Sequence, residues 1–431
     1  MSSTPMPSAG AIPTGTPRGR RHRWKVLSVG VAANASFSAA FSGIPTTAVL
    51  MRSDYHLDNA ALGLAMGLLG LGIAVSELPW GLLTDRWGDR RVLLLGLGGT
   101  AAALALMALF AAPNAGHAPG VGRLAIGMLV VGLLGGSVNG SSGRAVMAWF
   151  REGERGLAMS IRQTAVPLGG GLGALILPTL AATHGFVAVY GGLAALCAVT
   201  ALFAGRWLHA PPATDAAPFS SAIARGPLRN SEVWRVAAAI GLLCVPQIAV
   251  LTFGTIFLHD VGQVGIAMTS GILVTVQVGA GVLRVWSGRW TDRHQNRRAY
   301  MRGCSLASSA LFLVLALLAR TGAGAPSQAT LGAIVGLLAL GGICASAWHG
   351  VAFTELATLA GAGRAGTALA LGNSFAFMTL FVTPLVIPIV LETGSWPIVW
   401  LGAGGCALLA LPVFPRPVSA DRTGCRSATR R

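Results

Sequence analysis

The stretch GLLTDRWGDRR, from Gly81 to Arg91, follows a long apolar run of residues. A second stretch, GRWTDRHQNRR from Gly288 to Arg298, follows another such run. The glycine, the Thr-Asp-Arg triplet and the final Arg-Arg coincide when the two stretches are aligned at an offset of 207 residues. Two copies of one unit, in the same orientation along the chain, are the simplest explanation of this spacing.

Twelve apolar runs surround the two stretches, six in each half of the chain. The expected spans are 26–50, 60–84, 91–112, 121–147, 156–182, 186–206, 234–258, 264–290, 299–320, 328–358, 365–391 and 396–415. A helix needs roughly 20 apolar residues to cross a bilayer. Hydrophobic residues make up 53% of the chain and charged residues only 10%, whereas a typical soluble protein carries about 25% charged residues. The sequence therefore predicts an all-α polytopic membrane protein with twelve transmembrane helices in two pseudo-symmetric six-helix bundles.

The distribution of basic residues predicts how the chain is oriented. We divide it into an N-terminal tail (1–25), a first half (26–206), a Pro-bearing linker (207–233), a second half (234–415) and a C-terminal tail (416–431). Of the 31 Lys and Arg residues, 25 fall on the face that carries both tails and the linker, 3 on the other face and 3 within spans. Because cytoplasmic loops are enriched in Lys and Arg, we expect both termini on the cytoplasmic side of an inner cell membrane.

The first stretch also has a recognisable pattern, G-x-x-x-D-R-x-G-x-R-R. It resembles the signature loop of the major facilitator superfamily (MFS) of secondary transporters, and the resemblance covers residues 25–415. The motif residues are Gly81, Asp85, Arg86, Gly88, Arg90 and Arg91, with Gly288, Asp292, Arg293 and Arg297 in the second copy. The second copy has Gln295 where the first has a glycine. The resemblance implies a bacterial permease with the MFS fold, alternating access around a midplane site, and a gating role for this loop.

The chemistry of the signature loop is consistent with a gating role, because a carboxylate–guanidinium network at helix ends can form and break. The alternative is that these residues only set topology and packing.

Three arginines lie inside the expected spans. Arg144 ends its span on the cytoplasmic side, where a snorkelling side chain or a gate pair is expected. Arg162 and Arg284 lie deeper, where a charge is costly and needs a partner or a wet cavity. Arg284 lies eight residues before Asp292, and Arg162 lies seven residues after Arg155. At 1.5 Å per residue both are about 10–12 Å from the same membrane face. In the superfamily fold these two spans are neighbours, so an anion between the arginines would relieve their repulsion. We therefore predict that both contact a small organic anion, unless each has its own carboxylate.

Two carboxylates accompany them. Glu77 is the counterpart of Arg284 at the offset of 207 residues, and it is the candidate for a coupled proton or for a fixed partner of a buried arginine. Glu355 lies nine residues before Arg364, and we expect it to pair with loop arginines as a second gate.

Neutral polar residues inside the spans are further candidates for substrate contact. His349 can bind substrate or titrate, although a histidine hydrogen-bonded within a bundle is commoner. Gln163 and Asn373 correspond at an offset of 210 residues. Asn34, Asn139, Gln247 and Gln277 also lie in spans and can line a cavity or bridge helices.

Proton-driven efflux of drugs or amphipathic metabolites is the alternative function. The stretch RQTAVPLGGG, from Arg162 to Gly171, resembles a motif of exporting members. Arg162 and Val166 stand where exporters have glycine, which weakens the exporter interpretation and places a buried cation on this helix face. No nucleotide-binding loop, metal-ligand spacing or catalytic triad occurs, so we expect no enzyme activity, metal or cofactor. The expected partners are a small-molecule substrate, a coupled proton and the bilayer, without nucleic acid, for a protein that works as a monomer.

Overall fold

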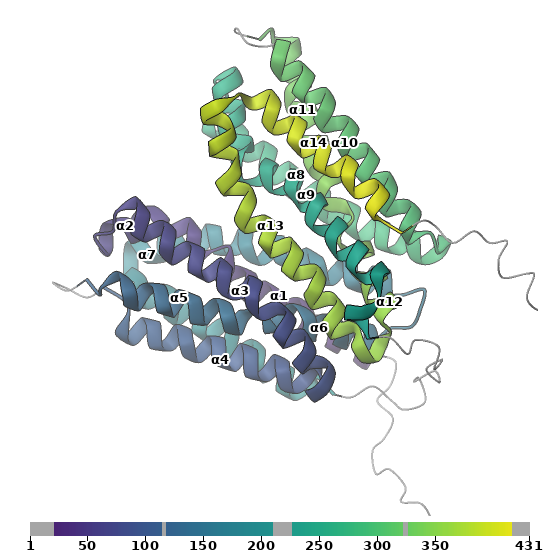
Figure 1. Ribbon diagram of the computed structural model, residues 1–431. Coiled ribbons are helices and arrows are strands. Elements are labelled where there is room, and N and C mark those ends of the chain that lie inside the picture. The colour runs from purple at the N-terminus through teal and green to yellow at the C-terminus, as the bar shows by residue number, and fades with distance from the viewer. Residues whose placement is uncertain (1–20, 114–117, 210–225, 322–325, 416–431) are drawn as a thin grey trace, which may run out of the picture.

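The computed structural model describes residues 21–113, 118–209, 226–321 and 326–415, and these are mostly helical (Figure 1). The first half contains α1 (His22–Phe41), α2 (Ala48–Asp54), α3 (Asn59–Trp87), α4 (Asp89–Phe110), α5 (Val121–Gly135), α6 (Ser137–Trp149) and α7 (Arg155–Trp207). The second contains α8 (Ser231–Gly262), α9 (Ile266–His294), α10 (Arg297–Thr321), α11 (Gln328–Ala347), α12 (His349–Ala360), α13 (Ala365–Thr393) and α14 (Trp396–Val413). Short 3-10 helices are η1 (Ile44–Thr47), η3 (Pro227–Arg229) and η4 (Ala362–Arg364).

Eleven helical stretches of the described chain are long and apolar enough to cross a membrane. One of them, α7, has 53 residues, which would extend about 80 Å at 1.5 Å per residue. Its backbone breaks at Gly185 (φ 72°, ψ −177°), a conformation that glycine adopts at little cost. Because α7 thus contains two spans, the twelve spans predicted from the sequence are confirmed for the described residues.

Polar side chains at the helix starts fix several of these boundaries. Asp58 precedes α3, and its Oδ1 accepts a hydrogen bond from the amide of Ala61 at 2.7 Å. Asn230 caps α8 in the same way through the amide of Glu232 at 3.0 Å. Such caps satisfy backbone N–H groups that have no partner in the first turn of a helix.

The two halves form separate bundles that touch through α3, α6 and α7 of the first half and α9, α12 and α13 of the second. Within the first half α1 and α4 pack on α7, and within the second half α10 and α8 pack on α14. Between the halves α3 packs on α13 and α7 packs on α9. In Figure 1 the bundles approach each other near α6 and α12 and diverge toward α2 and α11. We call the first region, which carries both signature loops, the motif end, and the opposite region the far end.

The hydrophobic core also differs between the motif end, where the bundles meet, and the far end, where they diverge. At the motif end one cluster joins side chains of both halves, among them Met159 and Leu369. Toward the far end the described residues form separate clusters, one around Tyr190 in the first half and one around Phe312 and Trp400 in the second. Full burial of a large apolar side chain contributes about 1.5–3 kcal/mol. The halves are therefore held together by apolar contact mainly at the motif end.

Three expected spans differ in detail. The span 26–50 is interrupted after Phe41, and a 3-10 helix begins at Ile44. Pro45 is tolerated in its first turn, where a backbone N–H has no partner to lose. The spans 121–147 and 328–358 each consist of two helices, which meet at Gly136 and at Trp348. Both residues keep helical dihedral angles, so the hydrogen-bond ladder loosens there without a reversal of direction. These two joints occupy equivalent places in the repeat.

Most of the expected tails and linker lie outside the described residues, namely 1–20, 210–225 and 416–431.

Candidate functional site

Asp85, near the end of α3, binds the beginning of α13. Its Oδ1 accepts from the amide of Gly366 at 3.0 Å, and its Oδ2 accepts from the amide and the hydroxyl of Thr367 at 2.9 and 2.5 Å. The first turn of a helix offers free N–H groups and partial positive charge, which favour a carboxylate. The first signature loop thus joins the first half to the second.

Asp292, near the end of α9, makes the equivalent contact in the opposite direction. Its Oδ1 accepts from the amide of Gly156 at 3.0 Å and its Oδ2 from the amide of Leu157 at 2.9 Å, at the start of α7. Each signature aspartate therefore caps a helix of the other half. Both caps exist only while the motif ends are together, so separating the halves there must break both.

The signature glycines allow this close approach. A Cβ atom on Gly81 would lie 2.4 Å from the Cβ of Ala370, and one on Gly288 would lie 2.5 Å from the carbonyl oxygen of Gly156. Both distances are far shorter than a van der Waals contact. A side chain at either position would push the two halves apart.

The glycine missing from the second copy has a structural explanation. Gly88 follows α3 with φ 86° and ψ 153°, a region that is essentially restricted to glycine. Gln295 follows α9 with φ 51° and ψ 35°, in the left-handed region that other residues can reach. Its Nε2 also donates to the carbonyl of Asp292 at 2.7 Å. The second turn has a different geometry and no longer needs a glycine.

The signature arginines have different environments. Arg90 donates to the carbonyl of Gly205 at 2.7 Å, within the first half. Arg297 is buried and pairs with Asp292 at 3.4 Å and with Glu152. Arg90 is exposed, as are Arg86, Arg91 and Arg293. Arg297 is thus the one whose ion pairs reach the Asp292 cap and, through Glu152, the first half.

Arg144 on α6 supports the first aspartate. Its Nε lies 3.4 Å from Oδ1 of Asp85, and its Nη1 lies 3.2 Å from Oδ1 of Asp89. The sequence allowed either a gate pair or a snorkelling side chain at this position, and the structure places Arg144 in the ion-pair network of the motif end.

Glu355 on α12 pairs with an arginine of the second signature stretch, inside the second half. Its Oε1 accepts from Nε of Arg298 on α10 at 2.6 Å, and Arg298 also donates to Glu232 on α8 at 2.8 Å. All three residues belong to one half, so these contacts brace that half.

Deeper in the bundle, Glu77 and Arg162 share α6 as a bridge. Glu77 is fully buried on α3, and its Oε1 accepts from Nδ2 of Asn139 at 2.6 Å. Arg162 is fully buried on α7, and its Nη1 donates to Oγ of Ser142 at 2.9 Å. The opposite charges lie within electrostatic reach, although no direct ion pair joins these two described side chains. The carboxylate thus balances the guanidinium without occupying its remaining donors.

Arg284 on α9 has a different set of partners. Its Nε donates to the carbonyl of Ser346 at 2.7 Å and its Nη1 to the carbonyl of Gln163 at 3.2 Å. Its Nη2 lies 3.4 Å from Nδ1 of His349. Gln163 belongs to the other half, so Arg284 bridges the interface. Among the described residues it has neutral partners and no carboxylate.

His349 follows the joint between α11 and α12. Its ring stacks on Trp348 with 4.0 Å between centroids, and its Nδ1 is 3.1 Å from the carbonyl of Ser346. If Nδ1 accepts from Arg284 it carries no proton, and if it is protonated it donates to the Ser346 carbonyl. Either tautomer fixes the ring beside the guanidinium.

Gln163 and Asn373 occupy equivalent positions of the two halves and are both nearly buried. Asn373, on α13, lies near Glu77. We call the set the polar cluster, which comprises Glu77, Asn139, Arg162, Gln163, Arg284, His349 and Asn373. The structure therefore brings together the predicted substrate contacts and the predicted proton carrier.

The polar cluster contains buried atoms without hydrogen-bond partners among the described residues. They are Oε2 of Glu77, Nε and Nη2 of Arg162, and Nδ2 of Asn373, joined by both amide atoms of Asn34 and by Oγ of Ser346. Buried polar groups are nearly always hydrogen-bonded in native proteins. Free donors and acceptors inside the bundle are what a polar ligand requires.

Two contributors were not predicted. Ser142 lies three residues after Asn139 and therefore on the same helix face, and Ser346 precedes the joint at Trp348. Serines are common in membrane helices, and neither position stood out without the kinks. Within the described residues no cluster of His, Cys, Asp and Glu could hold a metal ion.

Comparison with known proteins identifies the family. The family model of the Major Facilitator Superfamily matches residues 30–308. Two uncharacterised MFS-type transporters of Mycobacterium tuberculosis, from strains H37Rv and CDC 1551, are 29% and 28% identical over 404 residues, which are 93% of this chain and 86% of each relative.

Solved structures agree on the fold. The proton:xylose symporter XylE has a TM-score of 0.74 at 14% identity, over 92% of this chain and 97% of that one. The human organic anion transporter MFSD10 has a TM-score of 0.70 at 17% identity, over 91% and 99% of the two chains. FucP in its outward conformation has a TM-score of 0.66 at 15% identity, over 90% and 97%. The chain is a multi-pass membrane transporter that belongs to the Major Facilitator Superfamily.

Proposed function

We propose that this transporter moves a small carboxylate-bearing metabolite through the polar cluster by alternating access. The observation that carries the proposal is the positive excess of the cluster. Among the described residues it holds two buried arginines and one carboxylate, and Arg162 has two N–H-bearing atoms with no partner. A planar guanidinium binds a carboxylate through paired hydrogen bonds.

The charge of the cluster favours an anion over a sugar or a cationic drug. Structural neighbours include a sugar symporter and an organic anion transporter, so the fold alone does not select a substrate. A neutral sugar would leave the Arg284 charge uncompensated, and a cation would add to it. An anion between the halves would balance the cluster and satisfy Arg162.

The aspartate caps provide the gate in this proposal. Asp85 and Asp292 close the motif end by capping α13 and α7. Opening that end breaks four backbone hydrogen bonds at two pseudo-symmetric places, so the halves rock about the cluster as two bodies. The two bodies are residues 26–206 and 234–415, joined by the linker 207–233. The excess of basic residues on one face supports a cytoplasmic position for both termini and the motif end, and in this proposal the monomer is the functional unit.

A coupled proton is the second part of the proposal. Glu77 is buried, accepts one hydrogen bond from Asn139 and leaves Oε2 without a partner. Its charge is coupled to that of Arg162 by proximity. Protonation of Glu77 would raise the positive excess of the cluster and so favour the anion, which links proton and substrate in a symporter.

The experiment is a ligand screen by thermal unfolding of the purified protein. Each carboxylate is paired with its neutral amide, and cationic amphiphiles form a third arm that tests drug efflux. A ligand at 100 times its Kd adds about 2.7 kcal/mol of stability. We expect some carboxylates to stabilise the protein and their amides not to. Stabilisation by cationic amphiphiles alone would refute the anion proposal and favour the efflux alternative.

A further inference from the structure

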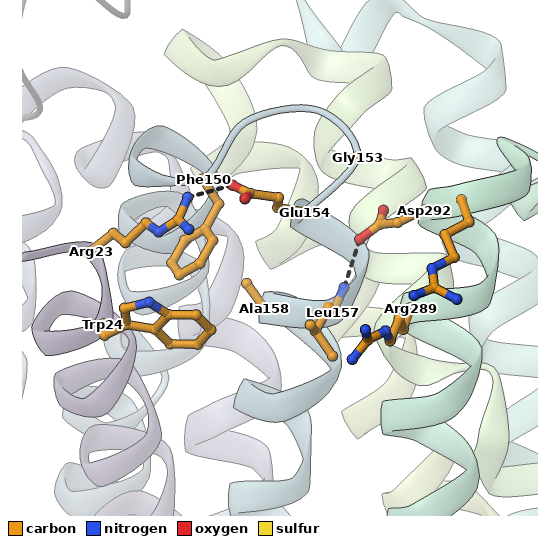
Figure 2. Close-up of a pocket in the computed structure, with 10 residues that line it drawn as sticks. Arg23, Trp24, Phe150, Gly153, Glu154, Leu157, Ala158, Arg289 and Asp292 are labelled. Carbon is orange, nitrogen blue, oxygen red and sulfur yellow. Dashed lines mark hydrogen bonds and ion pairs between the residues drawn. The ribbon is translucent and has the colours of Figure 1, made fainter. Parts of the chain in front are cut away.

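A second polar site lies at the motif end, and its lining includes no residue of the polar cluster. Figure 2 shows its side chains. It is a cavity of about 180 Å³ between α1 and α7 of the first half and α9 of the second. Its charged and aromatic lining consists of Arg23, Trp24, Phe150, Glu154, Arg289, Asp292 and Arg293. Three arginines and two carboxylates leave the cavity with a positive excess.

Both carboxylates are already engaged. Glu154 accepts from Nη1 of Arg23 at 2.5 Å. Asp292 accepts the amides that begin α7, of which the bond from Leu157 is drawn in Figure 2. They are therefore poorly placed to neutralise the remaining arginines of the cavity.

Arg289 and Arg293 are the unneutralised charges. They are four residues apart on α9 and thus lie on one helix face, where like charges repel. Both are exposed, and neither makes a hydrogen bond or ion pair with the residues that the structure describes. Two guanidinium groups at this spacing are suited to an anion with several oxygens, above all a phosphate.

The surroundings place this pair at the surface of the membrane. Trp286 and Trp290 stack on the same helix with 5.8 Å between centroids, and Trp286 is 52% exposed. Trp24 on the cavity wall is 46% exposed. Tryptophan is enriched at the level of lipid headgroups. Farther along α9 the side chains of Val282 and Val278 are exposed, which provides an apolar surface for acyl chains.

We infer that this cavity binds the phosphate of an anionic phospholipid, with Arg289 and Arg293 as its ligands. Residues of both halves line the cavity, so a bound headgroup spans the interface next to the Asp292 cap. The lipid therefore favours the arrangement in which the motif end is closed. This inference is independent of the transported substrate.

The test measures thermal unfolding of the full-length protein in detergent against added phosphatidylglycerol, phosphatidylcholine or inorganic phosphate. The variant is Arg289→Gln/Arg293→Gln. The matched control is Arg123→Gln/Arg320→Gln, which removes two exposed arginines at the far end. A third protein, Arg289→Lys/Arg293→Lys, retains the charge.

We expect phosphatidylglycerol to stabilise the wild type and the far-end control, with phosphatidylcholine and inorganic phosphate much weaker. In the Arg289→Gln/Arg293→Gln protein the half-saturating concentration should rise by roughly tenfold, and lysine should restore part of it. Equal stabilisation of that variant by phosphatidylglycerol would overturn the site. Equal stabilisation of the wild type by inorganic phosphate would overturn the lipid as its occupant.

Discussion

Arg162 belongs to the first half of the molecule and Arg284 to the second. Both lie in the polar cluster, yet their surroundings differ. Arg162 has a carboxylate nearby and two nitrogens without partners. Arg284 has three hydrogen-bonding neighbours and no carboxylate among the described residues. The first has donors to offer to a ligand, whereas the second supplies charge and is already bound by the protein.

The difference assigns separate tasks to the two arginines. Under the proposed function, Arg162 would be the direct ligand of the anion, and Arg284 would be a fixed positive charge, since it already bridges the halves through Gln163. The sequence treated them as an equal pair. Mutations that remove the hydrogen bonds of an arginine but keep its charge, or remove both, therefore test whether the two arginines have different roles.

The largest expected effect is that of Arg162→Gln. Loss of two charge-assisted hydrogen bonds, at about 1.5–3 kcal/mol each, should weaken binding of a stabilising carboxylate by roughly 100-fold or more. Titration of the purified protein by thermal shift or calorimetry measures this. Because the single variant leaves Glu77 without its balancing charge, the neutral pair Arg162→Gln/Glu77→Gln serves as the control for folding. Unchanged affinity in that folded pair would contradict the assignment.

Conservative replacement by lysine distinguishes the two arginines more sharply. Lysine keeps the charge but lacks the planar fork. Arg284→Lys should lower affinity by about tenfold or less, because the charge is retained, while Arg162→Lys should lower it clearly more. The same carboxylate titration compares the two proteins side by side. Equal losses would mean that both arginines contact the ligand directly.

Glu77→Gln sharpens the electrostatic part of the comparison. Removal of the carboxylate adds one unit to the positive excess, so anion affinity should rise by roughly fivefold at neutral pH, which is about 1 kcal/mol. The dependence of uptake on a pH gradient should disappear, since glutamine cannot carry a proton. Proteoliposomes with and without an imposed gradient provide the measurement. Gradient-driven accumulation equal to wild type would rule out Glu77 as the coupling residue.

The smallest effect is expected for His349→Asn. The histidine holds one end of Arg284 by a long contact of 3.4 Å, and the two carbonyl bonds of that arginine stay in place. Affinity should change by less than about threefold, or under 0.7 kcal/mol, and the pH dependence should persist. A pH profile of binding is the measurement, and its loss in this variant would move the titrating role from Glu77 to His349.

The repeated signature and the periodic apolar runs were sufficient to predict the twelve spans and the family, because both follow from spacing along the chain. The membrane depth of Arg162, Arg284 and Glu77 followed from the same counting. The direction in which each side chain points could not be predicted from that counting. Whether Arg284 meets a carboxylate or the carbonyls of Ser346 and Gln163 depends on packing between halves, which no local pattern encodes.

The helix joints were also invisible in the sequence. Gly136 and Trp348 lie inside continuous apolar runs, and only the three-dimensional structure shows that the helices loosen there. As a result Ser142 and Ser346 were not recognised as neighbours of the arginines. The signature glycines were recognised from the motif, whereas their contact distances come from the packing of α3 on α13 and α9 on α7.

The most direct test of the anion proposal is uptake of a stabilising carboxylate, labelled with a radioisotope, into proteoliposomes. Wild type, Arg162→Lys and the Arg162→Gln/Glu77→Gln pair are compared at equal reconstituted amounts. We expect the wild type to take up the labelled carboxylate, with inhibition by the unlabelled carboxylate and not by its neutral amide. Uptake by Arg162→Lys should be strongly reduced. The Arg162→Gln/Glu77→Gln protein should show no uptake. Uptake by the neutral pair at the wild-type rate would contradict an anion bound at Arg162.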